Sequence, residues 1–600
     1  MRFRTSSRCL FWLLLGIMLA SCMPGQAPDA VPEVRSVLPI GKVQGHASIS
    51  PYLGQNVHIQ RVVTGNFVSG LDGFFMQDAP GEDDGDPDTS DGIFVHWAAE
   101  RQPRVRRGDR IRVEGVVAEV EQGRGSQTSL VADVIEVLGR GAARITTISA
   151  PPDSVEAWER YEGMWLRIDG PMTVTGNDSL LRFGELVVSF DGRQFATTEV
   201  HRSGRAALRQ EVRNQRNRLI LDDNATQEYP DSIGYLPEPL SPQAPLRVGS
   251  IVHGIEGILH HAWGWRLQLT EPLERIEQAP RPEVPELPAG LRVASFNLYN
   301  WFNGDGQGKG FPTPRGAATL DEANRQRDKI VAAIIALKPD VAALMEVEND
   351  GFGRNSSLAE LVGALNLAWP EADYRLVDAG MGPGQDVMRV ALIHRAGRVE
   401  PVGDAVTVSS GSFAARNRMP LLQTFELPGT GARFQLVANH FKSKGCSEAE
   451  DADADQNDGQ GCWNATRSQA ARELHEWLAT DPTGQGARHG LILGDLNSYG
   501  QEDPIRILRE LGWRDALEVV GSERPYSFNY RGLSGRLDHA LLSDGLVPRL
   551  RAAVEWHINS DESEAFDYRT AHRQAGWYAP DAYRSSDHDP LILVLDLGQD

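Results

Sequence analysis

The stretch YRSSDHDPLILVLDL, residues 583–597, places two carboxylates and an imidazole directly before a proline and an apolar run. Asp and Pro are common turn residues, and five consecutive apolar residues are typical of a buried strand. The simplest interpretation is a polar turn that leads into a last β-strand. An Asp–His pair at a strand entrance also suits proton transfer, provided that other carboxylates and amides converge on it. The rest of the sequence has to decide between the two.

Five further polar strand ends precede this one within residues 291–598. In chain order the motifs are RVASFNLYN (292–300), PDVAALMEVEND (339–350), FQLVANHFKSKG (434–445), LILGDLNSYG (491–500) and GRLDHALLS (535–543). Each motif alone is compatible with a turn or a cap. Between them the sequence alternates predicted strands and helices, such as 324–337, which has Ile330, Ile334 and Leu337 on one face. An α/β scaffold gathers catalytic side chains at strand ends, so the six motifs together predict one active site.

The order of these motifs resembles the endonuclease/exonuclease/phosphatase superfamily, the group of pancreatic deoxyribonuclease and the sphingomyelinases. HFKSKGC (440–446), DGQGCWNATRSQA (458–470), YSFNYRG (526–532) and SSDHDP (585–590) are similar to bacterial extracellular endonucleases of the ExeM/NucH type. The resemblance implies an α/β catalytic domain, a four-layer sandwich of two sheets flanked by helices. It also implies one or two all-β, OB-like domains ahead of it.

A phosphodiesterase of this kind needs charge neutralisation, an activated nucleophile and a stabilised leaving oxygen. Hard oxygen ligands suit Mg²⁺ or Mn²⁺, so we expect Glu346 and Asp587 to hold the metal, with Asn297 beside it. His588 is the expected general base on water, oriented by Asp538. The turn of the opening stretch would then deliver a metal ligand and a base.

The remaining candidates are expected on the phosphate. Asp495 would orient the nucleophile or hold a second ion, Asn497 would donate to a phosphate oxygen, and His440 fits the phosphate or leaving-group side. The residues expected to bind substrate around them are Arg418, Asn439, Lys442 and Lys444.

The N-terminal sequence predicts an export signal. Basic residues precede a short apolar stretch, too short to span a membrane, which ends in Leu-Ala-Ser-Cys like a bacterial lipobox. We expect cleavage after residue 21 and lipidation of Cys22, although an ordinary secretory signal stays an alternative. The expected location is the outer membrane or the cell surface or exterior of a Gram-negative bacterium. The two cysteines left in the body of the chain, Cys446 and Cys462, then predict a disulfide worth about 3 kcal/mol.

Between the signal and the catalytic region, the sequence pattern predicts β-strands. Residues 22–46 are rich in Pro, Ala and Gly and predict a tether, and short β-runs punctuated by Gly and Asp over 47–141 predict an OB-like domain. A second β-rich domain is expected over 142–278. The proline-rich stretch 279–290 predicts a linker or an extended edge ahead of the catalytic domain.

The chain of 600 residues carries a net charge of −22, which argues against a nucleic-acid binder that relies on a basic patch. A nuclease that recruits divalent cations is not excluded, because the metal supplies positive charge. Two acidic loops, 81–92 and 451–458, predict solvated loops or a structural Ca²⁺ site.

These observations predict a divalent-metal-dependent extracellular nuclease that acts on DNA or RNA. It would be attached to the membrane only through an N-terminal lipid anchor. Two alternatives stay open: a sphingomyelinase or other phosphodiesterase of the same superfamily, and a non-catalytic nucleic-acid-binding lipoprotein. An exposed aromatic hairpin would favour the first alternative, and an incomplete catalytic set would favour the second.

Overall fold

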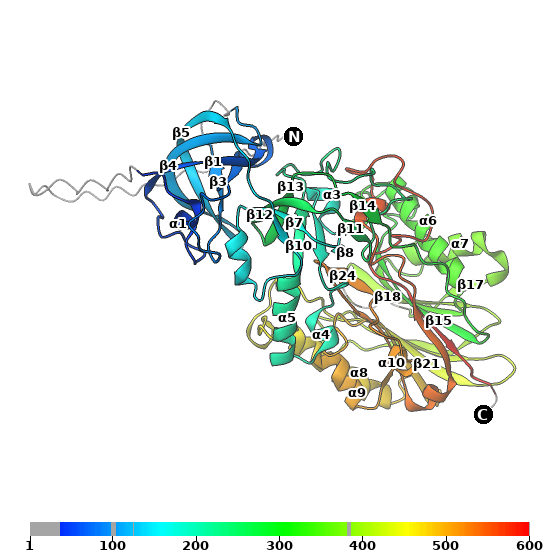
Figure 1. The fold of residues 1–600 in the computed structure, drawn as a ribbon. Coiled ribbons are helices and arrows are strands. Elements are labelled where there is room, and N and C mark those ends of the chain that lie inside the picture. Colours follow the sequence, from blue (N-terminus) through cyan, green and yellow to red (C-terminus); the bar gives the residue numbers. More distant parts are fainter. Residues whose placement is uncertain (1–35, 98–103, 124, 381–383, 385, 599–600) are drawn as a thin grey trace, which may run out of the picture.

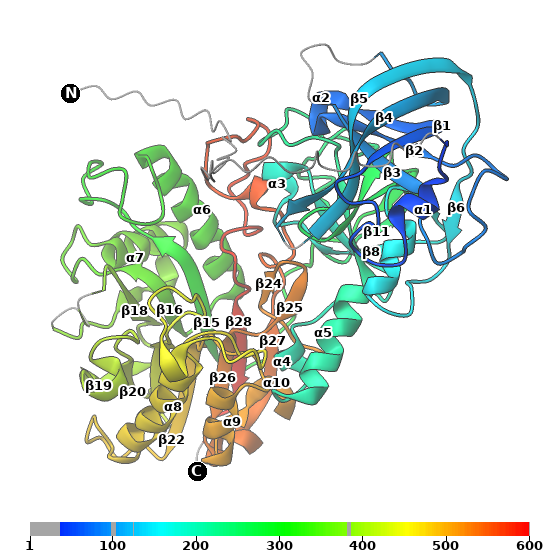
Figure 2. The same ribbon diagram turned by 90° about the vertical axis from the view of Figure 1, so that its left-hand side faces the viewer.

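The computed structural model describes residues 36–97, 104–123, 125–380, 384 and 386–598. Along the chain it forms a small closed barrel, a nine-stranded sheet and a pair of six-stranded sheets (Figures 1 and 2). The predicted signal peptide, residues 1–21, and Cys22 lie outside the described residues. Within the described residues, no helix is both long and apolar enough to cross a membrane.

The barrel is formed by strands that pair in the order β1-β2-β3-β5-β4 and close through β1 and β4. They are β1 Asn56–Phe67, β2 Gly73–Gln77, β3 Gly92–His96, β4 Asp109–Gln122 and β5 Gly125–Arg140, with helix α2 Val68–Leu71 between the first two. The predicted tether is wrong at its C-terminal end. Helix α1 Ile40–Gln44 packs against the barrel, with Ile40 and Val43 fully buried in its core, because two apolar residues three apart share one helix face.

The nine-stranded sheet has the order β14-β11-β8-β9-β10-β13-β12-β7-β6. Its strands are β6 Thr146–Ile148, β7 Trp165–Ile168, β8 Met172–Gly176, β9 Leu186–Ser189, β10 Arg218–Asp222, β11 Ile251–His253, β12 Glu256–His261, β13 Trp265–Leu269 and β14 Arg275–Glu277. The helices between these strands are η1 Glu156–Tyr161, α3 Leu180–Phe183, α4 Thr197–Val200 and α5 Arg205–Asn217. Its apolar core includes Phe566 and Trp577 from the C-terminal domain, so the sheet and that domain share buried surface.

The proline-rich stretch 279–290 is an extended segment fastened to both neighbours. The carbonyl of Pro280 accepts a hydrogen bond from Arg247, and that of Pro282 accepts from Trp556 Nε1 at 3.2 Å and Tyr583 Oη at 3.0 Å. Of the two interpretations of this stretch, the extended edge describes it better than a free linker does.

The C-terminal domain is built on two six-stranded sheets. Sheet one has the order β17-β18-β16-β15-β28-β27, formed by β15 Leu291–Trp301, β16 Val341–Glu348, β17 Tyr374–Leu376, β18 Met388–Arg395, β27 Leu550–Glu555 and β28 Leu591–Leu595. Sheet two has the order β19-β20-β21-β22-β26-β23, formed by β19 Glu400–Thr407, β20 Leu421–Glu426, β21 Arg433–His440, β22 His489–Asp495, β23 Arg514–Asp515 and β26 Asp538–Leu542. A hairpin of β24 Phe528–Tyr530 and β25 Leu533–Gly535 extends towards the nine-stranded sheet.

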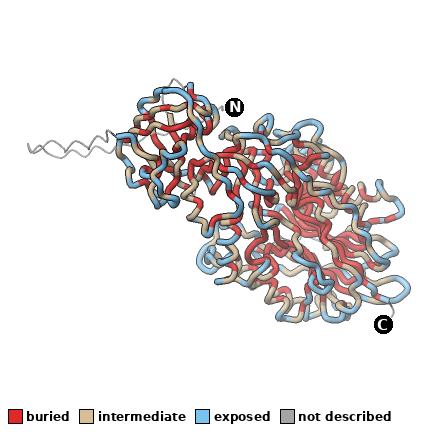
Figure 3. Tube along the Cα trace, in the orientation of Figure 1, coloured by how far each residue is buried: buried red, intermediate tan, exposed pale blue. Residues whose placement is uncertain are grey.

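Four layers result, as the resemblance to the superfamily implies. The two sheets pack face to face through one apolar core, to which Val293 and Leu392 contribute from sheet one and Leu436 and Leu493 from sheet two. Helices α6 Leu320–Leu337 and α7 Ser357–Ala368 cover the outer face of sheet one. Helices α8 Asn464–Ala479 and α9 Asp503–Glu510 cover sheet two, and α10 Ala516–Val519 follows β23. The buried residues concentrate between these layers (Figure 3).

Helix α6 shows how local sequence sets an element. Thr319 caps its N-terminus by accepting a hydrogen bond from the Glu322 amide, and the predicted apolar face of Ile330, Ile334 and Leu337 is buried against sheet one. The helix ends at Lys338, which adopts a left-handed conformation with φ 53° directly before a proline.

A buried ion network joins the C-terminal domain to helix α4. Arg536 Nε donates to Glu199 Oε1 at 2.9 Å, and Arg536 Nη1 donates to Asp515 Oδ2 at 2.8 Å. Glu199 Oε2 also accepts from the backbone amides of Arg536 and Gly500, both at 3.0 Å. All three charged side chains are buried, so each depends on the others to compensate its charge.

We therefore expect Arg536→Ala to lower the free energy of unfolding by about 3–5 kcal/mol, because it removes the guanidinium that two buried carboxylates share. Urea unfolding followed by circular dichroism measures this. Arg551→Ala, which removes an exposed arginine paired with Asp596, is the matched control and should shift the midpoint little. Equal shifts for the two variants would contradict the role of the network.

Candidate active site

Polar side chains from both sheets meet at one edge of the sandwich. In sheet two, the register pairs His440 with Asp495 and Asp495 with Asp538, so three functional side chains stand next to one another on adjacent strands. From sheet one, Asn297 Nδ2 reaches Asp495 Oδ2 at 3.3 Å. The turn before β28 adds His588, whose Nε2 lies 4.0 Å from Asp495 Oδ2. Residues nearly 300 positions apart in the sequence thereby share one site.

The closest pair in this site is His588 and Asp538. Nδ1 of His588 lies 2.7 Å from Asp538 Oδ2, which also accepts from Ser527 Oγ at 2.7 Å, and all three residues are buried. Burial lowers the pKa of His588, but the charges of Asp538, Asp587 and Asp495 outweigh it and raise this pKa well above its usual value. With Nδ1 held by a carboxylate, Nε2 is the nitrogen available for proton transfer.

Asp495 lies at the centre of the cluster. His440 Nε2 is 3.4 Å from its Oδ2, and the Asn497 amide donates to its Oδ1 at 2.9 Å. Burial raises the pKa of Asp495 to about 7, the effect of His588 in the opposite direction being smaller. A cation that enters the site would lower the pKa of Asp495 and favour its charged form.

Glu346 and Asp587 form a pair of like charges beside the cluster. Burial, followed by the charge of Asp587, raises the pKa of Glu346, while a hydrogen bond from Asn297 acts in the opposite direction. Both carboxylates keep partial access to solvent. Two carboxylates and an amide are hard oxygen donors, and their uncompensated charge fits a divalent cation such as Mg²⁺ or Mn²⁺.

The backbone is strained where these side chains project. Glu346 and Asn497 have φ of 60° and 46°, in the left-handed region that non-glycine residues seldom adopt. The pairing of β15 with β16 shifts register after Asn297, and that of β16 with β18 shifts after Leu344. Such strain and bulges concentrate at functional sites, where they redirect side chains out of the regular pleat.

His440 completes the cluster as a neutral group. Burial, and then the positive charge of Arg418, lower the pKa of His440 well below its usual value. Its Nδ1 has no hydrogen-bond partner among the described residues, although the side chain is 3% exposed. A neutral imidazole has a single N–H, and Nε2 is the nitrogen that faces Asp495.

A sequence profile described as the Endonuclease/Exonuclease/phosphatase family matches residues 301–588, a range that contains most of this cluster. These residues form a domain of that family. Family members are hydrolases of phosphoester bonds, so the chain carries a phosphoesterase domain. The predicted superfamily is confirmed, whereas the ExeM/NucH type and the OB-like barrel stay predictions. A search of curated proteins found no match.

Solved structures of low sequence identity match about half of this chain. A family protein from Bacteroides thetaiotaomicron is 17% identical with a TM-score of 0.35, over 52% of this chain and 97% of that one. The B. thetaiotaomicron mannosyl-6-phosphatase Bt3783 is 16% identical with a TM-score of 0.34, over 51% and 99%. D. rerio TDP2 complexed with a single-strand DNA product is 15% identical with a TM-score of 0.32, over 52% and 100%.

Of the predicted substrate-binding residues, Arg418 and Lys442 lie near the phosphoesterase site. Arg418 Nε pairs with Asp386 Oδ2 at 3.0 Å, and its charge influences both Glu346 and His440. Lys442 is partly exposed, with Nζ 3.3 Å from Ser443 Oγ. Asn497 Nδ2, predicted to donate to phosphate, donates to the Phe441 carbonyl at 3.1 Å.

Two predicted substrate contacts are wrong. The ammonium of Lys444 binds both oxygens of Glu502, at 2.6 and 2.7 Å, and the Gln460 carbonyl at 2.5 Å, so no donor is left for phosphate. Asn439 is buried, and its Nδ2 donates to the carbonyls of Val437 and Leu493. Sequence spacing places both residues near the site, but buried partners elsewhere in the fold occupy their donors.

A disulfide joins Cys446 and Cys462, as the cysteine count predicts. It closes the acidic loop 451–458, within which the Asp453 carboxylate accepts from the backbone amide of Thr466 at 2.8 Å, at the start of α8. That contact is consistent with a loop whose acidic residues serve local structure.

Sequence reasoning missed the hydroxyl groups that position the site. Ser527 Oγ donates to Asp538, and Ser586 Oγ donates to the Asn297 carbonyl at 2.7 Å, which ties the last turn to β15. Both serines stand in quoted motifs, YSF and SDHDP, next to residues singled out for chemistry. Asp589 accepts from the amides of Asn559 and Ser560, so its role is structural.

Replacement of Asp538 tests the pair it forms with His588. Because Asp538 raises the pKa of His588, Asp538→Asn should lower this pKa, move the acidic limb of the pH–rate profile to lower pH and reduce turnover. His588→Ala should reduce turnover by about 10²–10⁴-fold at every pH. The measurement is the pH dependence of phosphodiester hydrolysis at saturating Mg²⁺. An unmoved acidic limb in Asp538→Asn would exclude this coupling.

Proposed function

We propose that the protein is an exported, divalent-metal-dependent nuclease that hydrolyses phosphodiester bonds in DNA, with RNA as a further substrate. The observation that carries this proposal is the His588–Asp538 pair, which faces Asp495 and lies beside the carboxylates of Glu346 and Asp587. A base, a neutral imidazole and a pair of metal-ligating carboxylates together meet the needs of phosphodiester hydrolysis.

Glu346 and Asp587 would hold Mg²⁺ or Mn²⁺ through carboxylate oxygens, with Asn297 beside them. When bound, the cation neutralises charge on the scissile phosphate and on the leaving oxygen. Asn297 also connects this pair to Asp495, through its hydrogen bonds to Glu346 and to Asp495 Oδ2. The position of the metal ligands relative to Asp495 is thereby fixed.

On the nucleophile side, Nε2 of His588 takes a proton from water, which attacks phosphorus in line with the leaving oxygen. Asp538 holds the imidazole in the tautomer that leaves Nε2 free, and it stabilises the imidazolium that forms. Asp495 orients the water, and His440 donates to a phosphate or leaving-group oxygen. Asn497 acts through the backbone, since its amide fixes Asp495.

Nucleic acid is the substrate that the sequence favours. The motifs around the site are similar to those of ExeM/NucH-type endonucleases, and the strand order of the N-terminal barrel fits an OB-like domain. Export is supported by the lipobox at Cys22 and by the Cys446–Cys462 disulfide, since disulfides persist in oxidising compartments. An outer-membrane or surface location follows from the same segment.

The test is incubation of purified protein with circular plasmid, linear DNA and RNA, with and without EDTA. We expect loss of supercoiled plasmid that EDTA abolishes and that added Mg²⁺ or Mn²⁺ restores, because the carboxylate pair depends on a cation. His588→Ala serves as the inactive control. Activity towards phosphomonoesters alone, with every nucleic acid intact, would contradict the proposal.

A further inference from the structure

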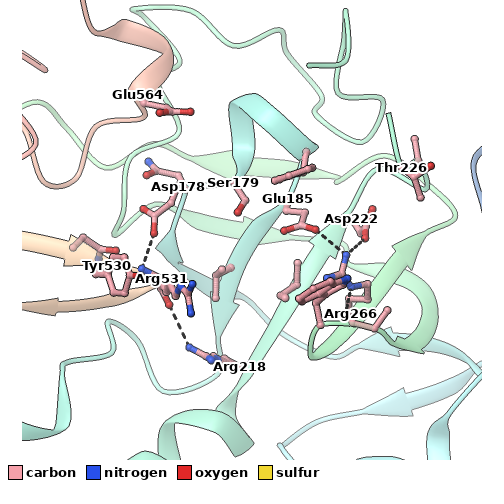
Figure 4. Close-up of a pocket in the computed structure, with 18 of the residues that line it drawn as sticks. Asp178, Ser179, Glu185, Arg218, Asp222, Thr226, Arg266, Tyr530, Arg531 and Glu564 are labelled. Carbon is pink, nitrogen blue, oxygen red and sulfur yellow. Dashed lines mark hydrogen bonds and ion pairs between the residues drawn. The ribbon is translucent and has the colours of Figure 1, made fainter. Parts of the chain in front are cut away.

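A cavity of about 980 Å³ lies between the nine-stranded sheet and the phosphoesterase domain, and Asp587 is part of its lining. Figure 4 shows that its walls come from both regions, with Arg218 at the start of β10 facing Arg531 of the β24–β25 turn. Arg218 Nη1 donates to the Arg531 carbonyl at 3.3 Å. The proposed metal-binding carboxylate therefore opens into a space built by two parts of the chain.

The cavity contains more positive charge than its own ion pairs use. Among the described residues, none of Arg218, Arg531 and Arg584 forms an ion pair, and Arg584 Nη1 only donates to the Asn559 carbonyl at 2.9 Å. Burial lowers the pKa of Arg218, and the opposing effect of the Glu211 charge is smaller. Each of these three guanidiniums therefore lies outside ion-pair distance of the carboxylates in the described residues.

Three of the six carboxylates in the lining form ion pairs with other arginines. Asp222 and Glu185 both bind Arg266, at 2.6 and 2.8 Å (Figure 4), and Glu562 binds Arg247 and Arg281. Asp178 Oδ2 accepts from the backbone amide of Arg531 at 2.6 Å. The charge of Asp178 acts on Arg531 and Arg584 but forms no ion pair with them. Their guanidinium donors can therefore still bind the phosphate of a ligand.

Aromatic rings lead from this cavity to the catalytic histidine. Tyr530, which is 53% exposed, stacks at 6.4 Å on Phe528, and the Phe528 ring lies 4.7 Å from that of His588. Trp263, which also lines the cavity, is 72% exposed. Exposed aromatic faces beside unpaired arginines are the combination that single-stranded nucleic acids use for base stacking and phosphate contact.

We propose that this cavity binds a single-stranded segment of nucleic acid next to the bond that is cleaved. Its bases would stack on Tyr530 and Trp263, and its phosphates would face Arg218, Arg531 and Arg584. The inference rests on the proposed nuclease function and refines it, because paired bases cannot stack on these rings. The nine-stranded sheet is then part of the substrate site. The hairpin that carries Tyr530 is fixed to it by Asn529 Nδ2, which donates to the Thr175 carbonyl at 3.0 Å.

The test measures dissociation constants for a fluorescent 20-nucleotide single strand and for the blunt duplex of the same sequence, in a His588→Ala background at fixed Mg²⁺. Loss of one stacking partner should weaken single-strand binding by about tenfold or more in Tyr530→Ala and in Trp263→Ala. Arg531→Gln should reduce the slope of log affinity against log salt by about 0.7. Both aromatic side chains are exposed, so their removal leaves the core intact.

Arg551→Gln removes the same charge from an exposed site in β27 and should change neither affinity nor salt slope. Single-strand binding that is equal in Tyr530→Ala, Trp263→Ala, Arg531→Gln and the control would overturn the cavity proposal. Cleavage assays with the unmodified enzyme separate failure of the cavity inference from failure of the proposed nuclease function. If it cleaves nucleic acid but the cavity variants bind normally, only this inference fails, whereas absence of any nuclease activity removes the proposed function itself.

A second group of ligating side chains lies away from the active site, between the barrel and the nine-stranded sheet. Glu159, Glu162 and His261 each offer one atom, and these atoms lie within 4.8 Å of one another. Glu162 Oε1 accepts from the Thr128 amide of β5 at 3.0 Å, and the His261 amide donates to Gln127 Oε1 at 3.1 Å, so barrel residues border the group.

Two side-chain atoms in this group have no hydrogen-bond partner among the described residues. Glu162 is 1% exposed, and its Oε2 lacks a hydrogen bond among the described residues, as does Nδ1 of His261. Neither Glu159 nor Glu162 forms an ion pair within the described residues. Burial, and then the charge of Glu119, raise the pKa of Glu159 to about 7. An unsatisfied buried carboxylate beside a second one is costly unless a cation or a proton compensates it.

From this geometry we infer that Glu159, Glu162 and His261 bind a divalent cation, Zn²⁺ or Mn²⁺, which suits mixed carboxylate and imidazole ligands. The ion would join the segment at the end of η1, which carries Glu159 and Glu162, to β12, which carries His261. This inference is independent of the proposed nuclease function, because it involves none of the catalytic residues.

Metal content after dialysis of the full chain against Zn²⁺ or Mn²⁺ tests this second inference. Glu162→Gln and His261→Ala should each bind one ion fewer per chain than the unmodified protein, and the exposed Glu121→Gln on β4 should bind the same number. In a Glu346→Gln variant, which lacks an active-site ligand, the metal should still raise the unfolding temperature. Equal metal content in all variants, or no such rise, would overturn the inference.

Discussion

The face-to-face packing of two sheets is the constraint on which the C-terminal domain depends. Side chains such as Val293, Ala343, Leu436 and Leu493 fill the space between the sheets and fix their relative position. At one end of this apolar layer the strands stop, and the polar residues that end them come together across the two sheets. The hydrogen bond from Asn297 to Asp495 is therefore a consequence of apolar packing.

Concentrating carboxylates at this edge has an electrostatic cost that the fold only partly offsets. His588 compensates Asp538, and Arg418 lies close enough to influence Glu346, yet the pKa of Asp495 stays raised to about 7 and that of Glu346 is raised as well. Uncompensated negative charge is what a divalent cation neutralises on entry. The same features that destabilise the metal-free domain would therefore give it affinity for metal and an anionic substrate.

The β regions ahead of this domain are integrated with it to different degrees. Phe566 of the phosphoesterase domain is part of the apolar core of the nine-stranded sheet, and Glu199 binds Arg536 of that domain in a buried ion network. The two regions therefore stabilise each other. The barrel has its own core, closed by α1. Because the shared surface also forms the wall of the cavity at Asp587, the nine-stranded sheet is placed to influence substrate choice.

The sequence by itself determined the element types, the four layers, the family of the C-terminal domain, the disulfide and the strand ends that meet in the active site. These depend on local patterns: apolar periodicity, the order of the motifs, and polar residues that follow apolar runs. Only the tertiary structure decided which donors are free. Lys444 and Asn439 follow the pattern of substrate ligands, but Glu502 and backbone carbonyls bind them instead. Conversely, Arg218, Tyr530 and Arg584 are far apart in the sequence and line one cavity. Hydrogen bonding, burial and charge compensation depend on neighbours that only folding brings together.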